Sequence, residues 1–202
     1  MSTTGSDLNQ AIQVLELRRD GDAYAWERVR RTWAAAVQDD RANLFSSVGV
    51  GARGVTFTIR KSRTLTLHNA FFWQGQFCFL TSIVEGDPGF QVVKAALCGP
   101  RRCAAVRRTG GLGPGNRPQV TEGPRVTFPG VLTEKYVRHT QEDSYARAEA
   151  LCVLVTPKAV ELLEGDLTTV EEGPAAGLYN VRACHVLDAY KNEYEIARRR
   201  DV

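Results

Sequence analysis

The sequence contains one short phrase twice, "GQFCFLTSIV" at residues 75–84 and "GLYNVRACHV" at residues 177–186. Both fit one template: Gly, any residue, an aromatic, any residue, an apolar residue, two free positions, a small residue, any residue, Val. Such a run after a glycine predicts a β-strand that follows a turn. The repetition indicates either two related β units, one in each half of the chain, or a chance likeness between two short apolar strands.

Short apolar runs recur on both sides of the chain's middle. The first half has "GVTFTIRKS", "TLTLHNAFFWQGQFCFLTSIVE" and "GFQVVKAALC", and the second half has "PRVTFPGV" and "LCVLVTP" besides its copy of the phrase. These runs are rich in β-branched and aromatic residues and are separated by Gly, Asn and Pro turns, so they predict a mainly β protein with two small β-barrel-like or sandwich-like units in tandem. The segment "AWERVRRTWAAAVQ" fits a helix as well as a strand.

A Gly/Pro/Arg-rich segment, "GPRRCAAVRRTGGLGPGNRP" at residues 99–118, divides the chain. It holds five Gly, three Pro and five Arg and no acidic residue. Because Gly and Pro at this density oppose regular structure, we expect a flexible basic linker here. The predicted domains are therefore residues 8–98, a β-barrel, and residues 119–202, a second β-rich domain with a charged tail.

Composition places the chain among ordinary globular proteins. It has 202 residues, of which 43% are hydrophobic and 24% charged, and it shows neither a membrane-length apolar run nor a signal-peptide pattern. We therefore expect no membrane association. Five cysteines, an odd number without an export signal, favour free thiols, and the "CGPRRC" pair at Cys98 and Cys103 lacks further ligands, so no metal or cofactor is predicted.

The sequence offers no catalytic constellation. Its three histidines form none of the usual motifs with a serine, a glutamate or each other. Cys184 and His185 are neighbours on a predicted strand, where adjacent side chains point to opposite faces, so they are badly placed to share a proton. The glycines of 99–118 lack the Lys-Ser/Thr of a phosphate loop. We expect a protein that is not an enzyme.

Charge is distributed unevenly. Residues 1–118 carry 16 basic and 9 acidic side chains, whereas residues 119–202 carry 10 and 14. The basic half is a candidate for contact with a polyanion. On the segment 99–118, arginines can reach phosphates, or they only keep a solvated loop soluble. The DNA-facing candidates are Arg53, Arg101, Arg102, Arg107, Arg108 and Arg117.

Two aromatic stretches have alternative interpretations. Phe71, Phe72 and Trp73 resemble a base-stacking platform, but alternation along a strand favours core packing for at least one face. The tail "DAYKNEYEIARRRD" carries an aromatic stripe near the chain end. We expect it to dock on a neighbouring subunit, and the alternative is packing on its own domain. The docking candidates are Tyr190, Tyr194, Ile196, Arg198, Arg199 and Arg200.

The order of these elements over about residues 10–98 resembles the tailed-phage head–tail joining proteins, also called head-closure or connector proteins. In that family a Trp-Ala segment is followed by an insertion loop, a strand ending in "IR", a turn with a Trp or Asp and a Gly, and an aromatic strand ending in "SI" or "SV". The matching residues are Trp33-Ala34, Ile59-Arg60, Trp73-Gln74-Gly75 and Ser82-Ile83. The C-terminal half is similar to a module found with such connector proteins.

The resemblance implies a structural virion protein of the phage neck, assembled in the host cytoplasm. It implies a homo-oligomeric ring that contacts a portal or adaptor protein and a tail or tail-terminator protein. Packaged double-stranded DNA would pass through the channel of that ring. The resemblance also implies that the loop "SSVGVGARG", 46–54, is disordered in the monomer and ordered on assembly. The alternative is a nucleic-acid-binding β-barrel module of the OB type, which would bind free oligonucleotides in a salt-sensitive way.

Overall fold

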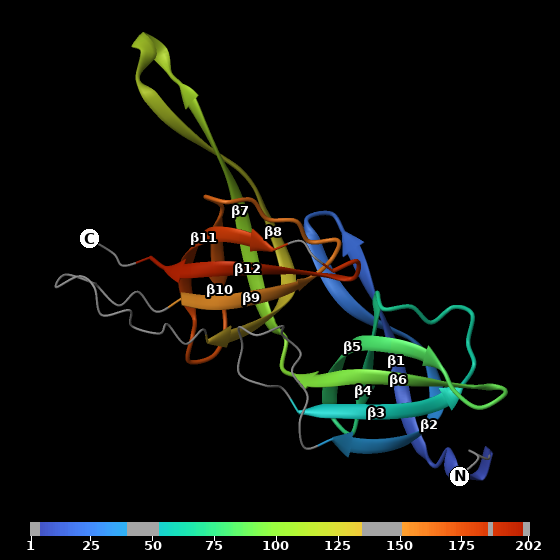
Figure 1. The fold of residues 1–202 in the computed structure, drawn as a ribbon. Coiled ribbons are helices and arrows are strands. Elements are labelled where there is room, and N and C mark those ends of the chain that lie inside the picture. Colours follow the sequence, from blue (N-terminus) through green and yellow to red (C-terminus); the bar gives the residue numbers. More distant parts are fainter. Residues whose placement is uncertain (1–4, 40–52, 135–150, 186–187, 200–202) are drawn as a thin grey trace. The chain divides into compact units, whose positions relative to one another are not determined.

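The computed structural model describes residues 5–39, 53–134, 151–185 and 188–199, and these residues are mainly β (Figure 1). Two three-residue 3-10 turns, η1 (Gly5–Asp7) and η2 (Pro114–Asn116), are the only helical elements in those ranges. The mainly β class predicted from the sequence is confirmed. The strands are β1 (Gln10–Asp20), β2 (Ala23–Asp39), β3 (Gly54–Arg60), β4 (Asn69–Trp73), β5 (Gln76–Glu85), β6 (Phe90–Cys98), β7 (Arg101–Leu112), β8 (Pro118–Glu134), β9 (Leu151–Pro157), β10 (Leu167–Val170), β11 (Gly177–His185) and β12 (Lys191–Arg198).

The chain forms two compact units. The first unit comprises Met1–Arg18 and Ala25–Pro100, and the second comprises Arg19–Tyr24 and Arg101–Val202. The tip of the β1–β2 hairpin therefore belongs to the second unit, although the stems of that hairpin belong to the first. The loop 46–54, for which ordering on assembly was predicted, lies outside the described residues except for Arg53 and Gly54.

The two units have the same strand order. In the first unit the strands pair as β1-β4-β5-β6-β3-β2, and a further pairing between β1 and β2 closes the ring of strands. In the second unit the order is β7-β10-β11-β12-β9-β8, and β8 pairs with β7 to close that ring as well. Adding six to each strand number of the first ring reproduces the second ring, so each strand of one unit has a counterpart in the other.

The repeated phrase lies on counterpart strands, but one residue out of step. In β5 the core-facing residues are Cys78 and Leu80, whereas in β11 they are Tyr179 and Val181. The β-bulges agree with this shift: one interrupts the β5–β6 ladder between Leu80 and Ser82, and the other interrupts the β11–β12 ladder between Val181 and Ala183. The structural counterparts are therefore 101 positions apart, although the sequence template aligns at 102.

Each unit has its own apolar core. In the first core, Phe57 packs edge-on against Phe71 and Trp73, with ring centroids 5.4 and 5.5 Å apart. In the second core, Tyr194 and Ile196 of β12 are almost completely buried. Burial of side chains of this size is the main term that stabilises each ring of strands.

The segment "AWERVRRTWAAAVQ" forms part of a strand. It lies within β2, whose C-terminal half pairs with β3 from Ala34 to Asp39. Trp26 packs on Phe77, and Trp33 is half exposed on the outer face. The helical alternative for this segment is wrong because ladder partners on β1 and β3 satisfy its backbone.

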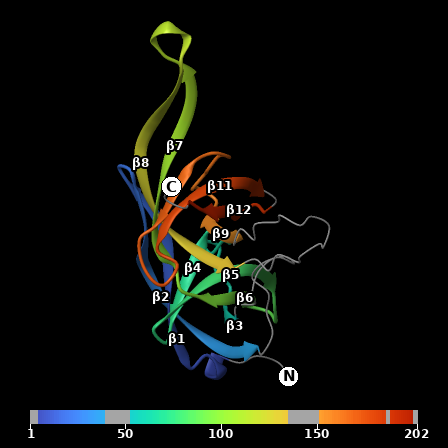
Figure 2. The same ribbon diagram turned by 90° about the vertical axis from the view of Figure 1, so that its left-hand side faces the viewer.

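The flexible linker predicted at 99–118 is also wrong. Residues Arg101–Leu112 form β7 and pair with β8 as far as its first residue, Pro118. Only 113–117 form the turn, where Gly115 and Asn116 have positive φ angles. Glycines fit this ladder because it is an exposed two-stranded ribbon, and a proline is tolerated as the first residue of a strand. Figures 1 and 2 show both strands running out from the ring of the second unit to this tip.

Candidate functional site

The segment after β3 and the segment after β9 have the same length and share three positions. The first segment is 61–69, whose last residue, Asn69, is the first residue of β4, and the second segment is 158–166, so each has nine residues and both are called loops below. Each begins with a lysine, and the fifth residue, Leu65 or Leu162, is buried. This likeness is stronger than that of the repeated phrase, because here the spacing in the sequence equals the spacing in the structure.

The backbone of each loop is held by a bond from its lysine N–H and by a buried amide side chain. The Lys61 N–H donates to the Gly89 carbonyl at 2.8 Å, and the Lys158 N–H donates to the Tyr190 carbonyl at 3.2 Å. A buried amide side chain fixes the next turn: Gln91 Oε1 accepts from the Ser62 N–H at 3.2 Å, and Asn192 Nδ2 donates to the Val160 carbonyl at 3.0 Å. Such bonds keep a loop in one conformation because an unmade buried bond is costly.

The last residue of each loop is a polar clamp. Asn69 Oδ1 accepts from the Thr66 N–H, and Asp166 Oδ2 accepts from the Leu163 N–H, both at 2.8 Å. In each case the clamp residue's own N–H returns to that residue's carbonyl at 3.1 Å. Asn and Asp side chains commonly close a turn in this way. The two clamps therefore perform the same structural task in the two units.

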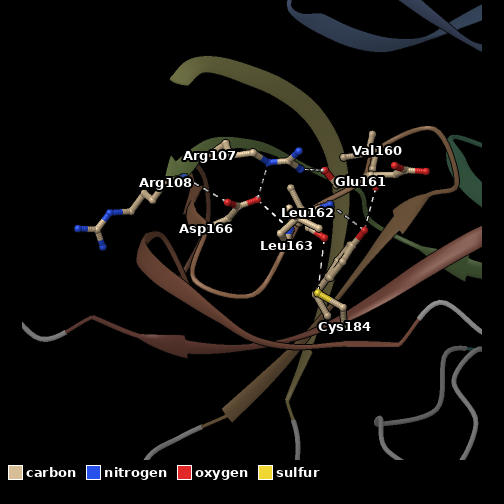
Figure 3. A network of polar contacts seen from close by, with 9 residues as sticks. Arg107, Arg108, Val160, Glu161, Leu162, Leu163, Asp166 and Cys184 are labelled. Atoms are coloured by element: carbon tan, nitrogen blue, oxygen red, sulfur yellow. Dashed lines mark hydrogen bonds and ion pairs between the residues drawn. The ribbon is translucent and has the colours of Figure 1, made fainter. Parts of the chain in front are cut away.

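The second clamp carries a charge and joins a larger network (Figure 3). The Asp166 carboxylate is 2% exposed, and its Oδ1 accepts from the Arg108 N–H at 3.3 Å. Arg107 Nε lies 3.6 Å from Oδ2, and the same guanidinium donates to the Glu161 carbonyl at 3.1 Å. A buried carboxylate needs such partners to stay charged. The network therefore ties the second loop to the β7 bulge.

A tyrosine and a thiol complete this network. The Tyr194 hydroxyl accepts from the Leu162 N–H at 3.0 Å and donates to the Val160 carbonyl at 3.1 Å. The Cys184 thiol donates to the Leu162 carbonyl at 3.5 Å. Burial raises the pKa of Tyr194 and of Cys184, so both groups stay protonated at neutral pH. Their contacts support the loop and leave no activated nucleophile at these two positions.

A cavity of about 350 Å³ lies beside the second loop, within the second unit. Its apolar wall includes Tyr24, Phe128 and Leu162. Its two arginines already have partners: Arg107 holds Asp166, and Arg19 donates to the Gly21 carbonyl at 2.9 Å and stacks on the Tyr24 ring. The cavity therefore has an apolar wall, and both of its arginines are already paired within the second unit.

The pair Cys184 and His185 behaves as predicted for strand neighbours. Cys184 faces the Leu162 carbonyl, whereas His185 Nε2 lies 3.3 Å from Glu195 Oε1. The two side chains therefore have different partners. Phe71 and Trp73 are buried in the first core, and Phe72 is partly covered by the Arg28 guanidinium at 5.1 Å, so the core-packing interpretation of this aromatic run is confirmed.

None of the five cysteines, all of which lie in the described ranges, is in a disulfide bond. Burial raises the pKa of Cys78, Cys98 and Cys103 to about 12, which keeps them protonated and unreactive at neutral pH. Within the described ranges no three side chains of His, Cys, Asp or Glu are grouped to hold a metal ion. In the same ranges no helix is long and apolar enough to cross a membrane.

The arginines predicted to face DNA lie in several places. Four of them are on β7 and make intramolecular contacts: Arg101 with the Glu172 carbonyl, Arg102 with Glu171, Arg107 with Asp166 and Arg108 with Glu122. Arg117 is exposed at the tip of the β7–β8 hairpin, and Arg53 is exposed just before β3. The structure therefore distributes these side chains over both units.

The docking role predicted for the C-terminal tail is wrong for its core residues. Tyr194 and Ile196 are 1% and 0% exposed because β12 pairs with β11 on one side and β9 on the other. Tyr190 is partly buried. Arg198 donates to the Ala176 carbonyl, Arg199 is exposed, and Arg200 lies outside the described residues. The aromatic stripe packs on its own unit, as the alternative interpretation held.

Sequence reasoning missed the most exposed part of the second unit. We name residues 107–125 the β7–β8 arm. One face of it carries Arg108, Gly110, Leu112, Pro118, Val120 and Glu122, since these residues pair across the ladder. Leu112 is 73% and Val120 52% exposed, whereas the other face carries Thr109, Gln119 and Thr121. The alternation of Val120 with the polar Gln119 and Thr121 was the signal, but the glycines and prolines around it hid the strands.

The chain matches no protein-family model, and no match to it is found among curated proteins or solved structures.

Proposed function

We propose that this protein is a structural subunit of the tailed-phage neck. In this proposal it forms a homo-oligomeric ring that joins a portal or adaptor protein to a tail or tail-terminator protein. Each ring of strands is one small barrel-like unit of a tandem pair. The proposal is supported by the family resemblance of residues 10–98. It is also supported by the polar groups around the second loop, Asp166, Tyr194 and Cys184, which all bond to other groups of the same unit.

The observation that carries the proposal is the β7–β8 arm. A self-contained monomer gains nothing from a long ribbon that holds Leu112 and Val120 in water, and exposed apolar faces generally mark interaction sites. The bonded contacts of Asp166, Tyr194 and Cys184 favour a scaffold over a reaction centre. A protein with an exposed arm that carries two apolar side chains on one face is suited to assembly.

In the proposed ring, packaged double-stranded DNA passes through the central channel. Arg53 and Arg117 are the best placed of the six candidate arginines to meet phosphates, because their side chains are exposed at a strand end and at a hairpin tip. The four on β7 already contact carboxylates or carbonyls. DNA contact in this proposal therefore depends on few charges, which suits a channel that must let the genome slide.

Electron microscopy of the purified protein mixed with portal complexes tests this function. The expected result is additional ring-shaped density on the portal, absent when the protein is omitted. A variant without the arm's apolar side chains, Leu112→Asp with Val120→Asp, serves as the matched control for nonspecific sticking. If the wild-type protein adds no density to portals alone or to portals carrying an adaptor, the neck assignment is wrong.

A further inference from the structure

The first unit exposes a set of large apolar side chains on the outside of its ring of strands. Most of the exposed large apolar residues in the described ranges belong to this unit: Val29, Trp33, Val37 and Val84. The first three share one face of β2, and it is the outer face, because Ala34 between them is fully buried in the first core. Apolar side chains that gather in this way generally mark an interaction site.

The ladders carry this outer face from β2 across three further strands. Ala35 of β2 pairs with Thr58 of β3, and Thr58 pairs with Val92 of β6. Val92 in turn pairs with Val84 of β5. Partners that lie directly opposite each other share a face of the sheet. Trp33, two residues from Ala35, therefore borders an apolar row that ends at Val84.

Basic side chains lie on both sides of this row. Lys94 pairs with Thr56 on one side of the Thr58–Val92 pair, and Arg60 ends β3 on the other side. Both cations are exposed, and neither has a carboxylate partner within the described residues. Strands β3 and β6 contain no acidic residue. We name the surface marked by Trp33, Val37, Arg60, Val84 and Lys94 the basic apolar face.

The neighbouring acidic side chains do not neutralise these cations. Glu27 of β2 pairs with Arg18 at 3.3 Å, and Glu85 of β5 pairs with Lys61. Each of these two carboxylates therefore has its own partner. A ligand that carries negative charge around an apolar group suits such a face, because complementary charges orient a contact.

The corresponding face of the second unit is buried and carries the opposite charge. The ladder partners across β5–β6 and β11–β12 keep the spacing of 101, so Lys94 of β6 corresponds to Glu195 of β12. Glu195 pairs with Val153 of β9, which is 2% exposed, and Val155 on the same face is 1% exposed. The first unit therefore leaves in water a face that the second unit buries.

The second unit carries an exposed acidic turn with an apolar residue in it. Residues 161–164 read Glu-Leu-Leu-Glu, and we name them the acidic turn. Leu163 is 53% exposed, and the flanking Glu161 and Glu164 are exposed without an ion pair in the part of the chain that the structure describes. The matching positions of the first loop, 64–67, read Thr-Leu-Thr-Leu and carry no charge. The two loops thus differ in charge, as the two outer faces do.

The network around Asp166 holds the acidic turn in one conformation (Figure 3). The Leu163 N–H donates to Asp166 Oδ2 at 2.8 Å, and the Glu161 carbonyl accepts from Arg107 at 3.1 Å. Leu162, between them, is anchored in the second core. A turn that is held in place before binding loses little conformational freedom on binding. The exposed side chains of the acidic turn are therefore presented to a partner at low entropic cost.

We propose that the acidic turn of one copy docks on the basic apolar face of a second copy. Leu163 packs on the apolar row of the face, and the two glutamates approach Arg60 and Lys94. A contact between two different surfaces of identical chains is heterologous, and such contacts close into rings when the rotation permits. This inference rests on the proposed assembly function, whose subunit contact it names, and it leaves the β7–β8 arm for other neck proteins.

Charge reversal tests the two surfaces separately. Arg60→Glu with Lys94→Glu makes the face acidic, and Glu161→Lys with Glu164→Lys makes the turn basic. Like charges then oppose each other in the contact, so each variant should raise the self-dissociation constant of the full-length protein by about tenfold or more. Sedimentation equilibrium measures this constant. All four side chains are exposed, so both variants should fold, and circular dichroism establishes that they do.

Mixing the two variants provides the decisive test. The acidic face of the first variant complements the basic turn of the second, and the unchanged face of the second complements the unchanged turn of the first. The equimolar mixture should therefore associate like the wild type, although each variant alone does not. A mixture that associates no more strongly than its components overturns the proposal, and so does a wild-type protein that stays monomeric at every accessible concentration.

Matched controls reverse the same number of charges elsewhere. Arg63→Glu with Arg199→Glu changes two exposed arginines outside the face, and Asp20→Lys with Glu172→Lys changes two exposed acids outside the turn. Both controls should self-associate like the wild type, because they alter the net charge and leave the contact intact. If either control weakens association as much as its matched variant, net charge explains the effect and the proposal is wrong.

Oligonucleotide binding tests whether the basic apolar face serves a nucleic acid instead. A single-stranded oligonucleotide is titrated into the wild type and into the variant Arg60→Glu with Lys94→Glu. The proposal expects this variant to lose self-association and to bind the oligonucleotide no more weakly than the wild type. A variant that loses oligonucleotide binding but associates like the wild type overturns the proposal.

A photoreactive phenylalanine analogue at position 163 identifies the contact directly. The expected cross-link joins it to residues 29–37 of β2 or 90–94 of β6 in another copy, identified by mixing isotope-labelled and unlabelled protein. Cross-links confined to one copy overturn the proposal. The outcome is independent of portal binding. A protein that binds portals without this cross-link keeps the neck function and loses the contact, whereas one that cross-links without binding portals keeps the contact and loses the neck function.

Discussion

The β1–β2 and β7–β8 hairpins are counterparts with opposite environments. β1 and β2 span 11 and 17 residues, and β7 and β8 span 12 and 17, so the stems are nearly equal in length. The tip of the first hairpin is anchored through Ala23 and Tyr24 in the second unit. Residues 109–112 and 114–125 of the second hairpin are exposed on both strands. The same element is thus a bound arm in one half of the chain and an unbound arm in the other.

This difference shows how two copies of one unit can differ in the surface that they expose for binding. The tip of the β1–β2 hairpin packs its Tyr24 side chain on the second core. The β7–β8 arm exposes Leu112 and Val120 instead. The loops 61–69 and 158–166 differ much less, because both fold back on their own unit. The predictions below compare the two units at matched positions, beginning with the largest expected effect.

Removing β12 should disrupt the second unit. Deletion of residues 190–202 takes away Tyr194 and Ile196, which are almost completely buried, and leaves β9 and β11 without a partner between them. We expect residues 101–185 to lose hydrogen-exchange protection. A truncated protein with an unchanged thermal transition would instead mean that β12 is not part of the second core.

Truncation of one large core residue in each unit should cost similar amounts. Phe57→Ala and Tyr194→Ala each remove a ring that is at most 1% exposed, so each should lower the free energy of unfolding by about 3–5 kcal/mol. Urea denaturation measures this. A loss below about 1 kcal/mol in one unit only would show that the two cores are not comparable, since surface substitutions have effects of that size.

The two polar clamps should contribute less than the cores, and unequally. Asn69→Ala and Asp166→Ala each remove the acceptor of a partly buried hydrogen bond, which costs about 0.5–1.5 kcal/mol. Asp166 has the larger expected effect because it also holds Arg107 and the Arg108 N–H. Asp166→Asn, which copies the first clamp, should retain part of the stability. Equal losses in the three variants would show that the charge of Asp166 has no role.

The two loop lysines should show the smallest effects. Lys158 Nζ donates to the Asp188 carbonyl at 2.8 Å in a partly buried setting, so Lys158→Met should cost about 0.5–1.5 kcal/mol. Lys61 pairs with the exposed Glu85, so Lys61→Met should lower the melting temperature at neutral pH by less than Lys158→Met does.

The Lys61–Glu85 pair also has a defined pH dependence. The hydrogen bond from Lys61 lowers the pKa of Glu85 below 4.5, so any contribution of this pair is present above that pH and is lost as the pH falls through the lowered value. The difference between wild type and Lys61→Met should therefore vanish in acid. A difference that grows in acid would assign the effect to another group.

Several features could be predicted from residues alone. Runs such as "GVTFTIRKS" and "GFQVVKAALC" combine β-branched residues with turn-forming neighbours, and both are strands. The relation between 75–84 and 177–186 was visible, but its register was not, because a β-bulge moves the core-facing residues by one position. The shared loop pattern, Lys, then Leu four residues on, then Asn or Asp after four more, was also present in the sequence but is too short to be recognised without the hydrogen bonds.

The sequence by itself determined the β class of this protein, since alternation and turn residues act over a few neighbours and need no distant partner. Only the tertiary structure decided that residues 101–112 form a strand, because glycine-rich segments become ordered when a second strand satisfies their backbone. Likewise, only the structure decided which large side chains face water. Tyr194 and Val120 both alternate with polar neighbours, and what separates them is that strands β9 and β11 flank Tyr194 while the arm leaves Val120 exposed.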